Sequence, residues 1–340
     1  MPEAQHEAIE NEATENEAIQ DDTGLDVVTG AFGFTGQHIA AWLLGEGRRV
    51  RTLTRDPDRP HPLAAHLEAC PYRFDNPVEL ARSMEGATTL YNTYWVRFER
   101  EGTSFDEAVA NSRALFQAAR RAGVRRIVHV SITNPDVGSR LPYFRGKALV
   151  ERDVAESGLS YGIVRPTVIF GEGDVMVNDV AWLLRRLPVF PYPARQASPV
   201  RPVFVGDVAR SCVDAARAHC DVVVDAVGPE TFDFVDFVGA IRTAVGSRSR
   251  LLPVPAPAVP VLAGLVGRVV NDVVLTRDEL AGLTAGLVAP GGPSTGQVVF
   301  TEWLAEHGET LGREWASEIG RHYRTTSPTR VPGDGIFQPV

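Results

Sequence analysis

The feature that most constrains the fold of this chain is a short glycine-rich stretch near its start. An apolar run from Leu25 to Val28 leads directly into glycines at positions 30, 33 and 36. The amphipathic segment that follows carries on one side Ile39, Trp42, Leu43 and Leu44. This order predicts a strand, a tight turn and a helix, the arrangement in which glycines let backbone N–H groups approach a pyrophosphate. A glycine-rich turn that binds no ligand is the alternative.

Charge is unevenly placed along the 340 residues. The formal net charge is −9, yet residues 1–22 alone hold eight acids and no lysine or arginine. The body of the chain is therefore close to neutral, which gives no support to a nucleic-acid partner. We interpret residues 1–22 as an acidic, disordered tail, with a short helix as the alternative.

Three cysteines, Cys70, Cys212 and Cys220, have neither metal-ligand spacing nor an even count. The pattern predicts no metal site and favours a reducing, cytoplasmic setting. The start of the chain lacks the basic and apolar regions of a signal peptide. Four prolines by residue 260 argue against a transmembrane span in the apolar stretch at 258–274, for which a lid over the substrate or a surface for a membrane or a subunit remains open.

Strands and helices are expected to alternate through the first two thirds of the chain. Six further strands are predicted at Val50–Arg55, Tyr72–Asn76, Ala87–Asn92, Arg126–Ser131, Ser160–Pro166 and Val222–Val227. Helices are predicted at 104–121, from Tyr143 to about Glu156, at 176–187 and at 232–245, with a last helical region at 301–324. Val203–Val208 is expected to return to the sheet and start a helix capped by Asp207. Repeated βαβ units predict an α/β fold with a doubly wound parallel sheet.

The end of the second strand bears on the choice of cofactor. An acid there would bind the ribose hydroxyls of NAD, whereas a nearby arginine accommodates the 2′-phosphate of NADP. Thr54 and Arg55 occupy that end, so we expect NADP(H) to be preferred over NAD(H). Arg55 as a solvated loop charge is the alternative. At the end of the fourth strand, Tyr94 and Trp95 either form the floor of a ligand pocket or pack in the core.

The residues most suggestive of chemistry are Tyr143 and Lys147, which lie one helical turn apart on one face. Lys147 is the only lysine in the chain. A neighbouring ammonium group favours phenolate and would lower the pKa of the tyrosine. The tyrosine can then exchange a proton with a carbonyl or alcohol while a nicotinamide exchanges hydride.

Taken together, these motifs resemble the short-chain dehydrogenase/reductase superfamily. They are Thr29-Gly30-x-x-Gly33-x-x-Gly36, the helix that carries Asn111, Val130-Ser131, Tyr143-x-x-x-Lys147 and Arg165-Pro166-Thr167. The similarity is to extended and atypical members: NAD-dependent epimerase/dehydratases, NmrA-like proteins and the NAD(P)H-binding accessory subunit of respiratory complex I. It covers residues 24–230 well and the remainder loosely.

The resemblance implies a Rossmann-type fold and a role for each matching position. Gly30, Gly33 and Gly36 would hold the pyrophosphate, Arg55 the 2′-phosphate and Asp75 the adenine. Tyr143 would be the acid/base, and Lys147 would hold the nicotinamide ribose. The cofactor site is further expected to include Phe32, Phe34, Thr35, Asn92 and Pro166. One position departs from the family: Ile132 stands where a serine or threonine assists the tyrosine, so that Ser131 or Thr133 would have to replace it.

We therefore expect a nucleotide-binding domain at 23–170, to which residues 203–228 return. A smaller substrate-binding region would follow at 171–202 and 229–325, with a tail at 326–340. The predicted function is an NAD(P)(H)-dependent oxidoreductase or epimerase acting on a small-molecule carbonyl or alcohol. The alternative is a non-catalytic NADPH sensor or structural accessory subunit. The sequence does not identify the substrate, although Arg185, Arg186 and Arg201 are candidates for binding a diphosphate, and it leaves a homo-oligomer or a peripheral membrane contact open.

Overall fold

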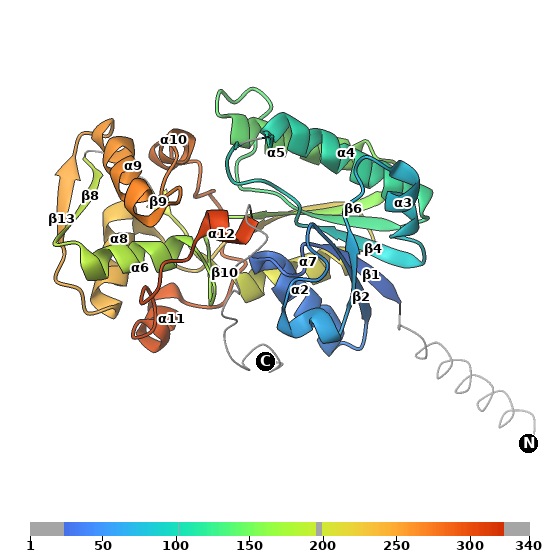
Figure 1. Cartoon of the computed structure of the whole chain (residues 1–340), viewed down its shortest axis with the longest axis horizontal. Coiled ribbons are helices and arrows are strands. Elements are labelled where there is room, and N and C mark those ends of the chain that lie inside the picture. The colour runs from blue at the N-terminus through green and yellow to red at the C-terminus, as the bar shows by residue number, and fades with distance from the viewer. Residues whose placement is uncertain (1–23, 101, 195–198, 323–340) are drawn as a thin grey trace, which may run out of the picture.

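The computed structural model describes residues 24–322 except 101 and 195–198. The predicted tails at 1–22 and 326–340 lie outside these residues. The chain forms two packed parts, which Figure 1 shows side by side: a sheet flanked by helices, and a smaller, mainly helical part.

A parallel sheet of seven strands forms the centre of the larger part. Its strands are β1 (Leu25–Thr29), β2 (Arg49–Thr54), β3 (Glu68–Pro71), β4 (Ala87–Asn92), β5 (Arg126–Val130), β6 (Ser160–Pro166) and β11 (Val222–Ala226). Their order is β3-β2-β1-β4-β5-β6-β11. This is the doubly wound order of a Rossmann fold with one added strand, which confirms the predicted fold class. The order reverses between β1 and β4, and ligands bind beyond the carboxyl ends of strands at such a point.

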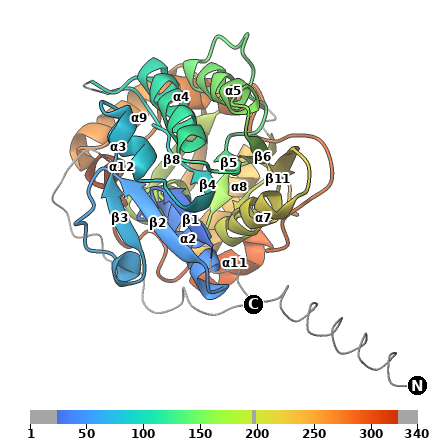
Figure 2. The ribbon, with the colours of Figure 1, turned by 90° about the vertical axis from the view of Figure 1, so that its right-hand side faces the viewer.

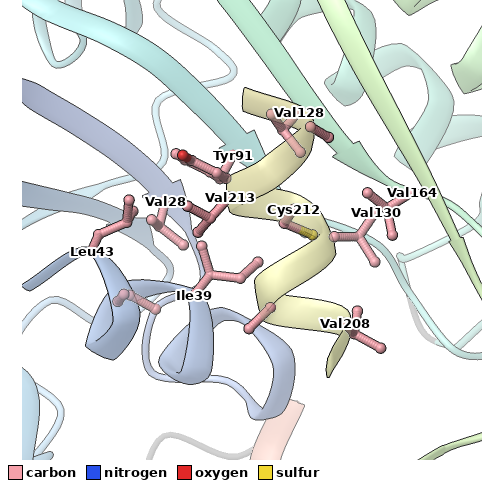
Figure 3. Close-up of a cluster of buried hydrophobic side chains, with 14 of the residues drawn as sticks. Val28, Ile39, Leu43, Tyr91, Val128, Val130, Val164, Val208, Cys212 and Val213 are labelled. Carbon is pink, nitrogen blue, oxygen red and sulfur yellow. The ribbon is translucent and has the colours of Figure 1, made fainter. Parts of the chain in front are cut away.

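Helices cover both faces of this sheet (Figure 2). One face is covered by α2 (Phe34–Gly45) and α7 (Val205–Arg217), and the other by α3 (Pro77–Arg82), α4 (Phe105–Arg121) and α5 (Pro142–Ala155). Neighbouring strand residues divide between the two cores because side chains alternate along a strand. Val28 and Val128 pack below α2 and α7, whereas Val27 and Ile127 pack against α4 and α5. Figure 3 shows the first of these clusters, in which Ile39 of α2 and Cys212 of α7 meet the strand valines.

The smaller part has its own apolar core, formed around Phe170, Phe237, Phe300 and Trp303. Its helices are α6 (Met176–Arg186), α8 (Phe234–Ala244), α9 (Ala258–Val270), α10 (Arg277–Thr284), α11 (Phe300–His307) and α12 (Glu318–His322). Its strands are β7 (Ile169–Phe170), β8 (Val189–Pro193), β9 (Pro199–Val200), β10 (Val203–Phe204), β12 (Phe232–Asp233) and β13 (Arg250–Val254). They form the pairs β7–β10, β9–β12 and β8–β13. A short 3₁₀ helix, η1 (Pro62–Ala65), follows β2 in the larger part.

The predicted third strand was misplaced. β3 ends at Pro71, before the expected Tyr72–Asn76 segment. The aromatic rings of Tyr72 and Phe74 instead stack on each other at 5.0 Å and pack against Tyr94. Asn76 caps α3 by accepting a hydrogen bond from the Glu79 N–H. The aromatic residues of this segment, which favour strands, therefore pack against Tyr94 and do not form a strand.

Several smaller expectations were also wrong. The segment at Val203 pairs with β7 outside the central sheet, although α7, which follows it, packs on that sheet. Asp207 does not cap α7; its carboxylate accepts hydrogen bonds from the N–H groups of Gln297 and Val298.

The expected helix at 301–324 is split into α11 and α12. The loop between them is held by Arg185 and Arg186, whose guanidinium groups donate to backbone carbonyls of residues 308–313. Within the described residues, none of the helices has the length and apolar character needed to cross a membrane. The division into domains at 170, 203 and 228 stays a prediction.

The closest backbone contact of the glycine turn generates a paired prediction. A Cβ added at Gly36 would lie 2.2 Å from the Gly30 carbonyl oxygen, whereas one at Gly45 of the same helix meets nothing within 4 Å. Gly36→Ala should therefore lower the free energy of unfolding by about 1–3 kcal/mol. Gly45→Ala should leave it unchanged or raise it by up to about 1 kcal/mol. Urea unfolding of the two variants measures this, and equal stabilities would contradict the close packing of α2 on the turn.

Candidate active site

The glycine turn joins β1 to α2 in a backbone conformation that other residues would resist. Gly30 has a φ of +66°, and its N–H donates to the Leu53 carbonyl at 2.8 Å. The Gly33 N–H donates to the Gly30 carbonyl, also at 2.8 Å. Gly36 then lets α2 pass directly above that same carbonyl. The predicted strand, turn and helix are confirmed. The three glycines lie where the backbone of the turn and the backbone of α2 approach each other most closely.

The N-terminus of α2 is open to an anion. Gly33 is its N-cap residue, and no side chain caps the first-turn N–H groups. The macrodipole adds partial positive charge at this end. Phe32, Gly33, Phe34 and Thr35 all line one large cavity. A helix N-terminus with uncapped N–H groups beside a cavity is suited to binding phosphate groups.

This cavity, of about 1210 Å³, extends from the glycine turn into the smaller part of the molecule. Ile132, Tyr143 and Phe144 also line it. The wall built by α6, β8, α8, β13, α9 and α10 is mainly apolar, although α6 and α10 also contribute Asp179, Asp278 and Glu279; among its apolar residues are Leu183, Phe190, Phe237, Leu252, Val259, Leu262, Val266, Leu280 and Leu283. The cavity therefore has a polar backbone end and a mainly apolar side-chain end, with a tyrosine in its lining.

Tyr143 stands in the first turn of α5, after Pro142. Its ring makes edge contacts with the rings of Trp95, Phe105 and Phe144, at centroid distances of 5.8–6.0 Å. Burial raises the pKa of this phenol above its ordinary value of 10, and the nearby carboxylate of Glu279 adds to the shift. This is opposite to the lowering expected from Lys147. A raised pKa favours the protonated phenol at neutral pH.

Lys147 lies one turn further along α5 and is buried. Its Nζ donates to the Val130 carbonyl at 3.0 Å and lies 4.7 Å from the centroid of the Trp95 ring. Burial lowers the pKa of this amine to about 7, with Glu151 opposing the shift. Glu151 is itself paired with Arg165. The lysine is thus held at the carboxyl end of β5. Because its pKa is lowered, only part of the amine is protonated at neutral pH, which reduces its electrostatic effect on the tyrosine.

The hydroxyl groups of Ser131 and Thr133 flank Ile132 just beyond β5. Both are buried, and neither has a hydrogen-bond partner among the described residues. Buried hydroxyls without partners are unusual in folded proteins. They therefore have unused capacity to donate to a ligand, as do Trp95 Nε1 and His129 Nε2, which are equally unpaired in the described part of the chain and lie near the ends of β4 and β5.

Asn92 occupies the predicted strand end, and its side chain is hydrogen-bonded within the protein through both its oxygen and its nitrogen. It donates to His129 Nδ1 at 3.1 Å, and its oxygen accepts from Thr29 Oγ1 and the Tyr94 N–H. His129 is buried, as expected of a structural residue. These bonds join the carboxyl ends of β1, β4 and β5. Pro166, the last residue of β6, is buried at the same edge.

Of the predicted adenosine-side residues, Arg55 and Asp75 are both exposed, and neither lines the cavity. Tyr94 does not line the cavity either. Its ring packs on Tyr72 and Phe74, and its hydroxyl oxygen accepts a hydrogen bond from the Asn111 side chain at 2.9 Å. Sequence reasoning missed Arg59, which lines the cavity beside the glycine turn. The sequence feature that could have indicated Arg59 is its position in the loop after β2, a few residues beyond Arg55.

A cluster of charges facing Tyr143 was also missed. Arg97 donates to Glu279 at 2.7 Å and lies 3.8 Å from the carboxylate of Glu318. Asp179, which lines the same cavity, has its pKa raised to about 8 by burial. These four residues come from four separate parts of the chain, so no local spacing predicts them. They give the apolar cavity one polar region close to the tyrosine.

The arginines considered for a diphosphate are otherwise engaged. Arg185 and Arg186 hold the loop at 308–313, and Arg201 donates to the carbonyls of Pro290 and Gly292. All three cysteines are free thiols.

A doubly wound sheet with a glycine turn at its switch point, an uncapped helix N-terminus and a tyrosine facing both defines a dinucleotide-binding α/β protein. In agreement, a family model described as NAD(P)H-binding matches residues 30–177. This part of the chain is therefore similar to NAD(P)H-binding domains, which agrees with the resemblance drawn from the motifs.

Known relatives include enzymes and a respiratory-chain subunit. The chain is 29% identical over 252 residues to ceramide reductase of Caulobacter vibrioides, covering 72% of this chain and 78% of that protein. It is 30% identical over 159 residues to subunit 9 of the NADH dehydrogenase (ubiquinone) 1 alpha subcomplex of mouse, covering 46% and 40%. Sterol demethylase protein B of Methylococcus capsulatus is 35% identical over 174 residues, covering 44% and 52%. The chain thus spans only about half or less of the latter two relatives.

Solved structures agree on the fold. Triphenylmethane reductase of Citrobacter sp. matches with a TM-score of 0.70 at 14% identity, over 84% of this chain and 99% of that one. The NADPH-dependent quinone oxidoreductase of Escherichia coli matches with a TM-score of 0.67 at 17% identity, over 83% and 99%. At such identities the likeness shows the fold alone.

The buried amine generates a prediction about pH. Between about pH 7 and pH 10 the unfolded chain binds a proton at Lys147 that the folded protein does not, so the free energy of unfolding should rise with pH. Lys147→Met removes this dependence. In urea unfolding, the free energy of unfolding of this variant minus that of wild type should therefore be largest near pH 6.5 and should decrease towards pH 9.5. Because the chain has no other lysine, a difference that does not change with pH would contradict a lowered pKa at this site.

Proposed function

We propose that the protein is an NAD(P)H-dependent oxidoreductase that reduces a carbonyl group on an apolar substrate, with Tyr143 as proton donor. The observation that carries this proposal is that one cavity contains both the glycine turn and Tyr143. Much of the cavity wall is formed by apolar side chains. A nucleotide held at the turn and a substrate held by the wall would therefore meet beside the phenol.

The residues present fit a nicotinamide dinucleotide. The close contact between Gly36 and the Gly30 carbonyl brings the first turn of α2 near the end of β1. No side chain caps the N–H groups of that first turn. At the other end of the expected site, the hydroxyls of Ser131 and Thr133 are buried without partners. When bound, the nucleotide would supply the hydride. The protein would bind the pyrophosphate at Gly30, Gly33 and Gly36, with Phe32, Phe34 and Thr35 bordering it.

Protonation of Tyr143 favours the reductive direction. A phenol whose pKa is raised by burial keeps its proton at neutral pH and is a donor rather than a base. We infer that its Oη–H donates to the carbonyl oxygen of the substrate, with Ser131 or Thr133 as the second donor in place of Ile132. Lys147 would position the end of β5 through its bond to Val130 and offer its remaining N–H groups to the nicotinamide ribose.

The cavity favours an apolar substrate over a sugar nucleotide. A sugar nucleotide brings a diphosphate, and Arg185, Arg186 and Arg201 are already bonded to carbonyls. The mainly apolar wall instead offers leucine, valine and phenylalanine side chains. Two of the relatives are named for lipid chemistry, as a ceramide reductase and a sterol demethylase protein. Asp179, whose pKa is raised to about 8, would be mainly protonated at neutral pH and would donate a hydrogen bond to a polar head group.

A non-catalytic role in holding NADPH is the second candidate. It is favoured by Ile132, which puts a side chain without a donor on the cavity wall, and by the bond from Lys147 to a backbone carbonyl. The similarity to a complex I subunit fits this candidate equally well.

Loss of the Tyr143 hydroxyl separates the two candidates. Tyr143→Phe should slow NADPH oxidation by long-chain ketones and aldehydes by about a hundred- to ten-thousandfold, because the proton donor is removed. The dissociation constant of NADPH, followed by its fluorescence, should stay within about twofold. Tyr161→Phe, a change in β6 away from the cavity, is the matched control and should retain activity. Tight NADPH binding without turnover of any carbonyl in wild type would instead support the second candidate.

The preference for NADP(H) is proposed on Arg55, at the end of β2, with Arg59 as a second cation nearer the cavity. Arg55→Ala should weaken NADPH binding by about ten- to a hundredfold and leave NADH unaffected, because only NADPH carries the 2′-phosphate. Arg49→Ala removes an equally exposed arginine from the opposite end of the same strand and should change neither. Equal affinities for NADH and NADPH in wild type would refute the preference.

A further inference from the structure

Helix α9 is apolar on more than one side. Its only charged residue is Arg268. One side, with Val259, Leu262 and Val266, lines the cavity. Another side carries Val261, Leu265 and Val269, which are spaced four residues apart and are exposed by 63%, 51% and 84%. Residues four apart lie on one face of a helix, so these three form a continuous apolar stripe directed outward.

The stripe belongs to a larger apolar surface, which we call the α9 face. Nine large apolar side chains are markedly exposed in the described part of the chain, and five of them lie together on β8, β13 and α9. These five, which define the α9 face, are Val189, Leu252, Val261, Leu265 and Val269. β8 pairs with β13 and contacts α9. Figure 1 shows the three elements gathered at the end of the molecule that is farthest from β1–β3. Clustered exposure of this kind marks an interaction surface.

The α9 face is also continuous with the cavity. Val189, Leu252 and Leu265 are each more than one third exposed, and each also lines the cavity. The apolar wall of the cavity thus reaches the surface here. A hydrophobic molecule at this face would therefore contact apolar side chains that continue into the cavity that Tyr143 also lines.

The stretch of chain that forms β13 and α9 is predominantly basic. From residue 242 to residue 275 the cationic residues are Arg242, Arg248, Arg250 and Arg268. The one acid in that range, Asp272, is buried and accepts hydrogen bonds from Trp315 and from the N–H groups of Glu318 and Ile319. In a chain with a formal net charge of −9, the stretch that contains β13 and α9 therefore carries four arginines and one buried acid, and the acids Asp278 and Glu279 follow on α10.

We propose that the α9 face docks on the surface of a lipid bilayer that contains anionic lipids. Apolar side chains would enter the acyl boundary while Arg248, Arg250 and Arg268 meet the head groups. The cavity would then open towards the lipid, from which an apolar substrate enters. The docking does not depend on the proposed turnover, because vesicle binding is measured without substrate or nucleotide.

Charge also argues against a second copy of the chain as the occupant. A symmetric pair would place the same surface on both sides, so that the arginines of one copy would face those of the other. Like charges brought together across an interface oppose association. A bilayer with anionic head groups complements the same arginines.

The test is flotation of the full chain with phosphatidylcholine vesicles, with and without phosphatidylglycerol. Wild type should bind the anionic vesicles and bind neutral ones much less. Val261→Gln/Val269→Gln changes two outward residues that do not line the cavity and should weaken binding about tenfold or more. Val78→Gln/Val223→Gln is the matched control, since these valines are exposed by 64% and 50% on other elements, and should bind as wild type does.

A third variant tests the electrostatic part. Arg250→Gln/Arg268→Gln should lose about fivefold in binding for each arginine on anionic vesicles, and little on neutral ones. Thermal unfolding should be unchanged in all variants because the altered side chains are exposed. No flotation of wild type, or equal flotation of the valine variants, would overturn the proposal. A wild-type dimer that Val261→Gln/Val269→Gln converts to a monomer, without vesicle binding, would assign the face to a second copy instead.

Discussion

The close passage of α2 over the end of β1 is the contact on which the rest of the structure depends. A side chain at Gly36 would meet the Gly30 carbonyl at 2.2 Å, so the helix can approach only because that side chain is absent. The approach places Ile39 and Leu43 against the strand valines and α7, as Figure 3 shows. It also sets the first N–H groups of α2 beside the cavity. Packing of the core and formation of an anion site are thus consequences of one backbone contact.

The cavity combines two surfaces with different chemistry. Its polar end is made of backbone groups from a turn early in the chain, whereas its apolar end is made of side chains from residues beyond 170. Tyr143 lines the same cavity. Burial, rather than a neighbouring lysine, decides the ionisation of both Tyr143 and Lys147, since it raises the pKa of the phenol and lowers that of the amine. An environment that disfavours charge suits a site that transfers a hydride to an apolar carbonyl while water is excluded.

Local sequence signals predicted the larger part of the molecule well because its features are local. The glycine turn, the helix starts at Pro77 and Ser104, and the pair Tyr143 and Lys147 each depend on residues within one or two turns of each other. The parts that could not be predicted depend on distant residues. The aromatic rings of Tyr72 and Phe74 pack on Tyr94 instead of extending a strand, and Asp207 binds residues 90 positions away. The cluster of Arg97, Glu279 and Glu318 is likewise assembled only by the fold.

The central claim is that a nucleotide at the glycine turn delivers hydride to an apolar carbonyl beside Tyr143. The most direct test uses NADPH carrying deuterium at the transferable position of nicotinamide C4, mixed with wild-type protein and a panel of long-chain ketones. Mass spectrometry of the products reads the outcome. The account predicts an alcohol with one deuterium on its carbinol carbon. Tight binding of the labelled nucleotide, with the deuterium retained and no ketone reduced, would contradict it and show that the site holds its nucleotide without turnover.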